Sequence, residues 1–366
     1  MTRVIISGGG TGGHIFPAIA IADAIRAREA DAEILFIGAE GRMEMERVPA
    51  AGYRIEGLKI SGIQRKLTAK NLLVPYRIVS AMLKARSILD GFKPDVVIGV
   101  GGYASGPTLR MASMKDIPTL IQEQNSYPGI TNKILAKKAS TICVAYEGME
   151  KFFPKEKIVM TGNPVRKNIQ SDPSRYPEAL QYFNLKDDRK IILVTGGSLG
   201  AGTLNNSIRK FINCSEKQDF QVIWQTGRYY YDSISRNEVL QNLDNVRIFP
   251  FIDRMDLAYT LADVVISRAG AIAISELCIV GKPVILIPSP NVTEDHQTKN
   301  AMALVRKNAA VLLRDEEAVG QLSPVLTELL ENEEKRVELS RNISALGIPD
   351  ASGRIAEEAL RLAKQR

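Results

Sequence analysis

The fold is decided by a stretch near the start of the chain, Val4-Ile5-Ile6-Ser7-Gly8-Gly9-Gly10-Thr11-Gly12-Gly13-His14. Its β-branched residues predict a strand, and the five glycines within residues 8–13 predict a loop. A helix is predicted next, from apolar residues at helical spacing: Ile15, Ala18, Ile19, Ala22 and Ile25. This order places backbone N–H groups and the positive end of a helix against a phosphate. The spacing of Gly8, Gly10 and Gly13 also fits G-x-G-x-x-G, a dinucleotide pattern that is weak evidence alone.

Length and composition are those of a globular protein with about two domains. The chain has 366 residues, of which 45% are hydrophobic and 24% are charged. It contains no run of about 18 apolar residues that would span a membrane, and the stretch before the glycines is too short for a signal peptide. The formal charge of +7 and the pI of about 9.2 suit nucleic acid or an anionic membrane surface.

The few cysteines and histidines predict no metal site. Cys143, Cys214 and Cys278 form no C-x-x-C pair, and His14 and His296 are isolated. We therefore expect no structural zinc and a reducing compartment, either the cytoplasm or the cytoplasmic face of the membrane.

Short apolar runs alternate with helical patterns through the first half. Strands are predicted at residues 4–6, 32–38, 95–100, 118–121 and 141–145, and such alternation predicts a parallel doubly wound sheet. The third of these strands runs into a second glycine loop, Gly99-Val100-Gly101-Gly102-Tyr103-Ala104-Ser105-Gly106-Pro107. Because ligands bind beyond the carboxyl ends of parallel strands, two glycine loops at one edge predict a ligand crevice.

A basic and apolar segment lies between the second and third of these strands. Residues 59–93, from Lys59 to Lys93, hold eight lysines and arginines and one acid, Asp90, with apolar residues between them. Two interpretations are open: a crossover helix with a solvated basic face, or a helix at an anionic bilayer surface with its apolar residues inserted. No recognition motif accompanies the charge, so we expect no nucleic-acid partner.

The second half repeats the layout of the first. Residues 190–195 predict a strand that enters Gly196-Gly197-Ser198-Leu199-Gly200-Ala201-Gly202, and an offset of 187 residues aligns Gly9 with Gly196 and Thr11 with Ser198. Further strands are predicted at 220–224, 246–249, 263–266, 283–287 and 310–313. We therefore predict an α/β protein with two Rossmann-like doubly wound parallel-sheet domains that face each other across a cleft. The expected parts are an N-terminal domain over residues 1–163, a C-terminal domain over 164–345, and a helix within 346–366 that packs back on the N-terminal domain.

Two segments of the second half carry candidate ligand contacts. Residues 268–276 follow a predicted strand, and their glycine and small residues leave a helix N-terminus open to a ligand. Glu276 in that helix is able to accept hydrogen bonds from paired ribose hydroxyls, although a solvent-facing acid is the alternative. The polar loop 288–297 lies at the same predicted edge and suits sugar hydroxyls.

These segments together resemble a known family. Its markers, in chain order, are residues 9–14, 101–107, 122–125, 162–166, 196–201, 251–253, 268–276 and 295–297. Nearly the whole chain resembles the undecaprenyldiphospho-muramoylpentapeptide β-N-acetylglucosaminyltransferases of bacterial cell-wall synthesis (the MurG type). The resemblance implies a GT-B fold, with the donor UDP-N-acetylglucosamine in the C-terminal domain and the undecaprenyl-linked muramoylpentapeptide, lipid I, in the N-terminal domain. It implies inverting transfer to the muramoyl 4-hydroxyl, giving lipid II, by a peripheral enzyme on the cytoplasmic face of the inner membrane.

The resemblance also implies roles for single residues. Those implied in substrate binding are Thr11, Gly12, Gly13, Asn125, Arg166, Ser198, Ile252, Arg268, Ala271, Ile272, Ala273, Ile274, Ser275, Glu276 and Gln297. Of these, Ile252 would hold uracil through its backbone, Glu276 the ribose and Gln297 the N-acetylglucosamine hydroxyls. Tyr103 and Ser105 are implied on the acceptor side. Some relatives have Gln-Gln where this chain has His296-Gln297, which leaves the role of His296 open.

The chemistry of transfer selects one further residue. Breaking the anomeric bond passes through an oxocarbenium-like state, and prearranged donors must meet the charge of the leaving diphosphate. Ser198, loop N–H groups and a helix N-terminus supply such donors, so we expect no metal and no cofactor. Inversion also requires a base, and His14, whose unperturbed pKa is about 6.5, follows a glycine loop. The alternative is that His14 only shapes the loop.

Three other functions are compatible with parts of the sequence. An NAD(P)-dependent oxidoreductase would use the Gly8, Gly10 and Gly13 pattern, with Glu40 as its ribose acid, but it leaves the glycine loop at residues 196–202 and the helix at residues 268–276 without a function. A UDP-sugar sensor or scaffold would share the binding residues. Another transferase of the same architecture would act on a different glycolipid.

Overall fold

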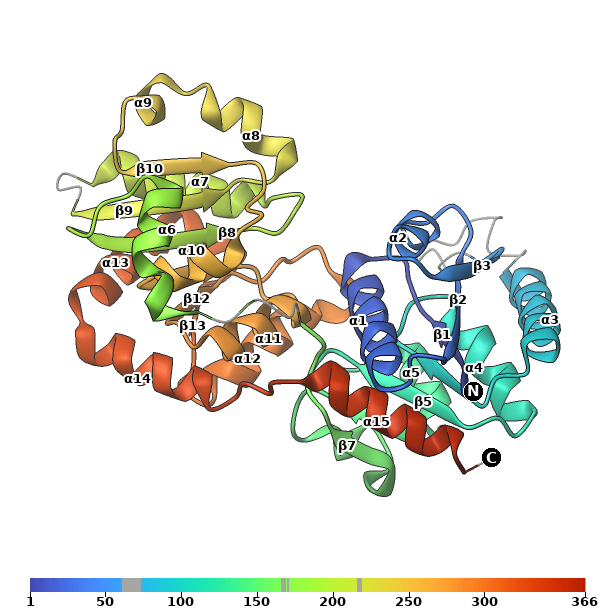
Figure 1. The fold of residues 1–366 in the computed structure, drawn as a ribbon. Helices are drawn as coiled ribbons and strands as arrows, with labels where there is room; N and C mark the ends of the chain where they lie inside the picture. Colours follow the sequence, from blue (N-terminus) through green and yellow to red (C-terminus); the bar gives the residue numbers. More distant parts are fainter. Residues whose placement is uncertain (61–73, 166–168, 170, 216–218, 366) are drawn as a thin grey trace. The chain divides into compact units, whose positions relative to one another are not determined.

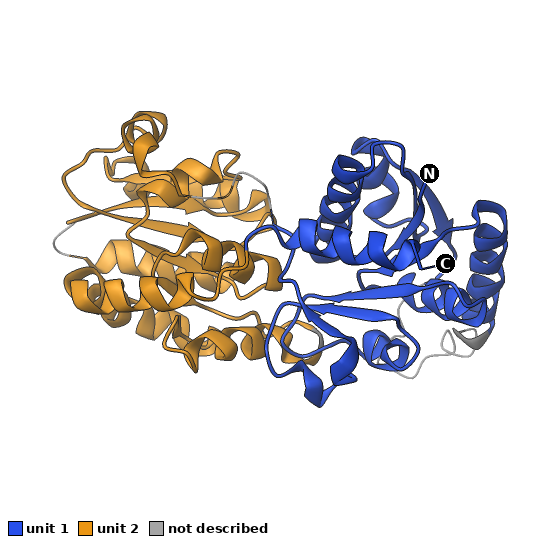
Figure 2. Ribbon diagram, turned by 60° about the horizontal axis from the view of Figure 1, so that its bottom comes forward, with its two compact units in different colours: residues 1–165, 349–366 blue, residues 166–348 orange. Residues whose placement is uncertain are grey.

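The computed structural model describes residues 1–60, 74–165, 169, 171–215 and 219–365. The chain forms two compact units, unit 1 from residues 1–165 and 349–366 and unit 2 from residues 166–348 (Figures 1 and 2). The boundaries expected from the sequence were residues 163 and 345, whereas the contacts divide the chain after residues 165 and 348.

Unit 1 contains a parallel sheet whose seven described strands have the order β3-β2-β1-β4-β5-β6-β7. Along the chain they are β1 (Arg3–Ser7), β2 (Glu33–Ala39), β3 (Arg54–Leu58), β4 (Val96–Gly99), β5 (Thr119–Glu123), β6 (Thr141–Val144) and β7 (Ile158–Met160). The strand order reverses at β1, so the carboxyl ends of β1 and β4 flank the switch point where such sheets bind ligands.

Helices cover both faces of this sheet (Figure 1). One face carries α1 (Gly12–Arg28) and α15 (Ala351–Ala363); the other carries α3 (Val74–Phe92), α4 (Ser105–Met114) and α5 (Ile130–Ala136). Val4 and Ile6 of β1 join the core under α1 and α15, whereas Ile5 joins the core under α3 and α4. Successive side chains of a strand point to opposite faces, so a continuous apolar strand serves two cores.

Unit 2 repeats this plan with six described strands in the order β10-β9-β8-β11-β12-β13. They are β8 (Lys190–Thr195), β9 (Phe220–Gln225), β10 (Val246–Phe249), β11 (Val264–Ser267), β12 (Val284–Leu286) and β13 (Val311–Leu312). The helices are α6 (Tyr176–Phe183), α7 (Gly202–Cys214), α8 (Arg228–Ser235), α9 (Glu238–Gln241), α10 (Met255–Leu261), α11 (Ala271–Val280), α12 (His296–Val305), α13 (Asp315–Glu331) and α14 (Glu333–Ser344). The strand order reverses at β8, which makes β8 and β11 the counterparts of β1 and β4.

The predicted α/β class with two parallel-sheet domains is confirmed, and each strand predicted from an apolar run is present. β3 and β7 were not predicted. β3 has the sequence RIEGL, and Arg54 and Glu56 are exposed at the edge of the sheet, so the strand lacks the apolar run that marks the buried strands.

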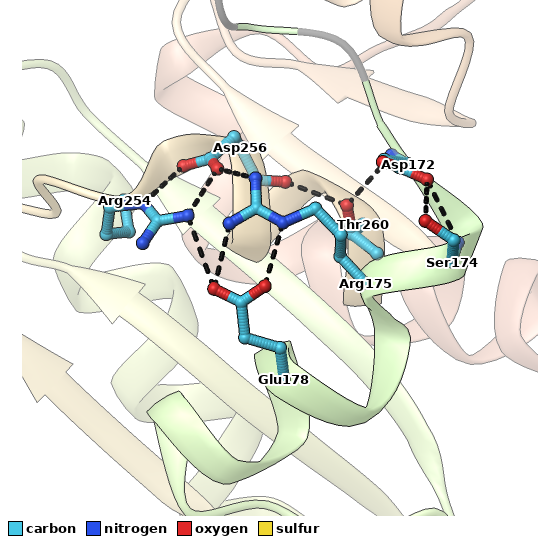
Figure 3. A network of polar contacts seen from close by, with 7 residues as sticks. All are labelled: Asp172, Ser174, Arg175, Glu178, Arg254, Asp256 and Thr260. Atoms are coloured by element: carbon cyan, nitrogen blue, oxygen red, sulfur yellow. Dashed lines mark hydrogen bonds and ion pairs between the residues drawn. The ribbon is translucent and has the colours of Figure 1, made fainter.

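A network of ion pairs fixes the start of unit 2 (Figure 3). Arg175 contacts Glu178 of α6 and Asp256 of α10 at 2.8 Å, and Arg254 contacts Asp256 at 2.8 Å. Hydrogen bonds from the two arginines hold the pKa values of Glu178 and Asp256 below the usual carboxyl range. The backbone N–H of Asp172 also donates to Thr260 of α10 at 3.1 Å. These contacts attach the segment before α6 to α10.

Candidate active site

The loops that follow β1 and β4 lie against each other in unit 1. A side chain at Gly8 would overlap Val100, and one at Gly102 would overlap the carbonyl oxygen of Gly9. Gly102 also has a φ of +85°, which side chains disfavour. The two glycine loops predicted from the sequence therefore meet at one edge of the sheet, and glycine is what permits the close approach.

His14 lies in the first turn of α1, and its ring is fixed by the loop. Its Nδ1 is 3.1 Å from the carbonyl oxygen of Gly9 and 3.2 Å from Thr11 Oγ1. A carbonyl oxygen only accepts, so we assign the Nδ1–H tautomer, in which Nδ1 donates to Gly9 and the lone pair of the neutral ring is on Nε2. The ring also lies close to Gly101, where a Cβ would come within 2.8 Å of it. This tautomer suits a base that takes up a proton at Nε2.

A buried acid that the sequence analysis did not select supports the same loop. Glu44, the first residue of α2 (Glu44–Ala50), is 1% exposed. Its Oε2 accepts from the N–H of Gly10 at 2.9 Å and its Oε1 from the N–H of Ala39 at 3.0 Å. An acid in the first turn of a helix is ordinarily a solvated partner of the helix dipole, so no local sequence signal marks this role of Glu44.

Ser105 and Tyr103 occupy different environments in the loop after β4. Ser105 is fully buried, and its Oγ lies 2.7 Å from the carbonyl oxygen of Ser7 and 2.8 Å from that of Gly101. Its hydroxyl therefore ties the end of β1 to the loop after β4. Tyr103 is 49% exposed and presents its side chain at the surface of unit 1.

A second buried acid holds Asn125 at the end of β5. Glu123 is 2% exposed and accepts from the backbone N–H of Asn125 at 3.0 Å, from Asn125 Nδ2 at 3.2 Å and from Asn132 Nδ2 at 2.8 Å. Burial raises the pKa of Glu123, while these hydrogen bonds act in the opposite direction. Among the sequence markers Glu123 had no role of its own; its place at the carboxyl end of a buried strand was the available signal.

In unit 2, the loop after β8 packs against the turn after β9. Gly200 has a φ of +83°, and a side chain there would overlap the carbonyl oxygen of Thr226. Ser198 and Leu199 are exposed at the tip of the loop, Leu199 by 76%. The loop therefore offers a hydroxyl and backbone groups to a ligand while its base is fixed.

Gln225, also missed from the sequence, connects this loop to residue 252. Its Nε2 donates to Thr195 Oγ1 at 3.2 Å and to the carbonyl oxygen of Gly197 at 3.1 Å, and its Oε1 accepts from the N–H of Ile252 at 2.9 Å. Gln225 is 3% exposed. One neutral amide thus positions both the glycine loop and the backbone of Ile252.

Arg268 joins segments that follow three different strands. Its Nη1 donates to the carbonyl oxygens of Ile287 at 3.0 Å and Pro288 at 3.1 Å, and it pairs with Asp315 at the start of α13. Asp315 in turn accepts from Thr203 Oγ1 of α7 at 2.8 Å. The structure therefore gives Arg268 a clear part in holding the edge of the sheet.

The helix α11 begins at the same edge, directly after β11. Ala271, Ile272 and Ala273 are partly exposed in its first turn, where helical N–H groups lack intrahelical acceptors. Ile274 is buried, Ser275 Oγ donates to the carbonyl oxygen of Ala271 at 3.0 Å, and Glu276 is 9% exposed. Glu276 is consequently not the solvent-facing acid that the sequence left as an alternative.

Gln297 lies at the start of α12, and its Oε1 accepts from the N–H of Ser289 at 2.8 Å. The two residues before His296, Glu294 and Asp295, have φ values of +57° and +51°. Two successive non-glycine residues in the left-handed region are uncommon, and such strain occurs most often at functional sites.

Some expectations fall outside the described residues. Arg166 and residues 61–73 of the basic segment lie outside the described residues. Among the residues that are described, no group of three or more His, Cys, Asp or Glu side chains could hold a metal ion. No helix in the described ranges combines the length and apolarity needed to cross a bilayer.

The described part of the basic segment forms α3, whose outer face is apolar as well as charged. Tyr76, Val79 and Leu83 are 72%, 55% and 62% exposed, while Ala81 and Ala85 face the core. Exposed large apolar side chains at helical spacing are typical of an interaction surface.

Two parallel doubly wound sheets, each with a glycine loop after its central strand, are the architecture of the GT-B fold. The chain belongs to glycosyltransferase family 28: residues 4–144 match the model of the family's N-terminal domain and residues 191–355 that of its C-terminal domain.

Curated relatives and a solved structure agree with this placement. The chain is 56% identical over 360 residues to the UDP-N-acetylglucosamine–N-acetylmuramyl-(pentapeptide) pyrophosphoryl-undecaprenol N-acetylglucosamine transferase of Parabacteroides distasonis, with 98% of each chain covered. It is 55% identical to the protein of the same name from Bacteroides thetaiotaomicron, covering 99% of this chain and 98% of that one. The crystal structure of Acinetobacter baumannii MurG superposes with a TM-score of 0.80 at 28% identity, covering 99% of this chain and 100% of that one.

Proposed function

We infer that this chain transfers N-acetylglucosamine from UDP-N-acetylglucosamine to undecaprenyl-diphospho-muramoylpentapeptide, lipid I, and so forms lipid II for peptidoglycan synthesis. The observation that carries this conclusion is the identity of 55–56% to curated transferases along almost their whole length.

We propose that unit 2 holds the donor. The exposed hydroxyl of Ser198 and the first-turn N–H groups of α11 suit the diphosphate, because both are donors at the switch point of the sheet. The nearly buried Glu276 is assigned to the ribose and Gln297 to the sugar hydroxyls. The N–H of Ile252 is donated to Gln225, so we assign the carbonyl oxygen of Ile252 to the N3–H of uracil. Arg268 orders the segments that carry these groups.

We assign the acid–base chemistry to unit 1. The 4-hydroxyl oxygen of the acceptor attacks C1 of the sugar, the bond from C1 to the diphosphate breaks, and UDP leaves. The hydroxyl proton passes to Nε2 of His14, whose Nδ1–H is held by the carbonyl oxygen of Gly9. Thr11, Gly12, Gly13 and Asn125 are assigned to the sugar of the donor. The acceptor side is assigned to Tyr103, with Ser105 holding the loop beneath it.

The decisive experiment measures transfer of labelled N-acetylglucosamine to a lipid I analogue, with and without EDTA. Equal product in both arms supports the proposal and a mechanism without a metal ion. Transfer to another glycolipid and not to lipid I would redefine the acceptor, and UDP binding without turnover would favour a sensor. Thermal stabilisation by NADH and not by UDP would favour an oxidoreductase, although Glu40, its candidate ribose acid, already pairs with Lys84 at 3.2 Å.

We also propose that α3 and the basic residues of the segment 59–93 contact the cytoplasmic face of an anionic membrane. The support is the exposed apolar row of Tyr76, Val79 and Leu83 beside Lys84 and Arg86. A variant with Tyr76→Ser and Leu83→Ser should sediment less with vesicles containing anionic lipid. Val239→Ser, which removes an exposed apolar side chain from unit 2, is the matched control. Equal sedimentation of both variants would contradict the proposal.

A further inference from the structure

We propose that Glu44 is a positioning residue for the reaction, and that it acts on His14 through the peptide group between Gly9 and Gly10. The inference rests on the proposed role of His14 as the base. It adds a residue from α2, which neither the glycine pattern nor the family markers include.

The geometry consists of two hydrogen bonds at opposite ends of one peptide group. Glu44 Oε2 accepts from the N–H of Gly10 at 2.9 Å, and the carbonyl oxygen of Gly9 accepts from Nδ1–H of His14 at 3.1 Å. That N–H and that C=O belong to the same planar trans unit and point in opposite directions. A carboxylate, a peptide and an imidazole therefore form a continuous chain.

The carboxylate has little room to move. Glu44 is 1% exposed, its second oxygen is held by the N–H of Ala39 at 3.0 Å, and side chains at Gly9 and Gly38 would overlap it. On the far side of the peptide, Gly102 approaches the carbonyl of Gly9 so closely that a Cβ there would overlap it. The peptide group is thus confined between α2 and the loop after β4.

This arrangement has two consequences for His14. A hydrogen bond from the peptide N–H to a negative charge is a strong one, and it polarises the peptide so that its carbonyl oxygen accepts more strongly. The proton on Nδ1 is therefore fixed, which keeps the lone pair of the neutral ring on Nε2. The same polarisation stabilises the imidazolium that forms when Nε2 takes up the acceptor proton.

Other ionisable groups on the packed segments are placed differently. The β2–α2 connection, α2 and the β4–α4 loop carry Glu40, Arg42, Glu46, Arg47 and Tyr103, all exposed. Glu40 also pairs with Lys84. Within the described residues, Glu44 is the ionisable side chain of these segments that hydrogen-bonds to the glycine loop. Glu46, two residues along the same helix and exposed, offers a matched control.

NMR of the full-length protein with ¹⁵N-labelled histidine tests the relay directly. The chain has only two histidines, so His14→Ala assigns the spectrum and His296 serves as an internal reference. We expect the Nδ1–H tautomer for neutral His14 in the unaltered protein. We expect Glu44→Gln to move the titration midpoint of His14 to lower pH, and Glu46→Gln and the His296 signal to stay unchanged. An Nε2–H tautomer in the unaltered protein would overturn the proposal without any variant.

The activity of the same variants separates this inference from the proposed function. Glu44→Gln should lower kcat roughly tenfold, a part of the ~10²–10⁴-fold that a general base contributes, and leave KM for UDP-N-acetylglucosamine within about twofold. Glu44→Asp should recover part of kcat. An unchanged titration midpoint in a folded Glu44→Gln variant sinks the relay, even if His14 is the base. If Glu44→Gln shifts the midpoint but His14→Ala stays active, the relay stands and the base assignment fails.

Discussion

The glycine loops after β1 and after β8 follow the central strands of two similar sheets, yet they rest on different chemistry. Behind the loop after β1 lies the carboxylate of Glu44, which accepts from the N–H of Gly10. Behind the loop after β8 lies the neutral amide of Gln225, which donates to the carbonyl oxygen of Gly197. The first loop therefore gives a donor to a buried negative charge, whereas the second is fixed through an acceptor and leaves the exposed Ser198 at its tip.

This difference separates the functions of the two loops. A buried carboxylate beside a loop disfavours a diphosphate and favours a protonated histidine, because like charges repel and opposite charges attract. A neutral amide imposes no such penalty on an anion. Similar strand–loop–helix units thus suit proton transfer in unit 1 and a nucleotide diphosphate in unit 2.

The largest loss of activity is expected from His14→Ala, a change in unit 1. Removal of the base should lower kcat by about 10²–10⁴-fold and leave the affinity of the protein for UDP unchanged, since the donor groups of unit 2 remain. Steady-state kinetics and calorimetric titration with UDP measure the two quantities. Activity within about tenfold of the unaltered enzyme, roughly 1.4 kcal/mol of barrier, would exclude base catalysis by His14.

A charge placed behind the second loop should make it resemble the first. Gln225→Glu puts a carboxylate beside Gly197 and Thr195, and we expect UDP to bind about tenfold or more weakly, because a buried charge repels the diphosphate. Gln241→Glu, an exposed change in α9, is the control. Equal UDP affinity for both variants in calorimetry would mean that the group behind the loop does not select the ligand.

A smaller effect, on the free energy of unfolding, is expected from changes at two glycines of the loop after β8. Gly200 and Gly197 have similar φ values, +83° and +84°. A Cβ added at Gly200 overlaps the carbonyl oxygen of Thr226, whereas a Cβ added at Gly197 meets open space. Gly197→Ala should cost about 1 kcal/mol of unfolding free energy from backbone strain alone, and Gly200→Ala clearly more. Urea unfolding of both variants measures the difference, and equal costs would show that packing on Thr226 is unimportant.

The smallest effect is expected from the exposed ion pairs of unit 2. The pKa of Glu178 is lowered in the folded state by its hydrogen bond with Arg175, so its contribution is present above the ordinary carboxyl pKa and is lost as pH falls through the folded value. Glu178→Gln should therefore lower Tm slightly at neutral pH and not at all in acid. A Tm difference that grows as the pH is lowered would reverse this sign.

The sequence was sufficient for the fold because buried parallel strands are continuous apolar runs. The runs at 190–195 and 263–266 have no competing interpretation, whereas β3 alternates Arg54 and Glu56 with apolar residues and was missed. The loop glycines were also recognised from the sequence, because close backbone approach requires glycine and leaves a visible glycine cluster. Glu44 and Gln225 were missed because the loop groups that they hold, the N–H of Gly10 for Glu44 and the backbone of Gly197 and Ile252 for Gln225, are distant in sequence, and nothing local to either residue records those contacts.

The last helix has a consequence for the order in which the protein is made. α15 supplies Ile355, Ala356 and Ala359 to the same core as Ile15 and Ile21 of α1. Unit 1 cannot complete this core until residues 351–363 have left the ribosome, whereas all residues of unit 2 have been synthesised before them. During synthesis, therefore, the apolar face of α1 stays uncovered by α15 while unit 2 is already able to fold. The nascent first half is the part of this chain that we expect to need chaperone protection.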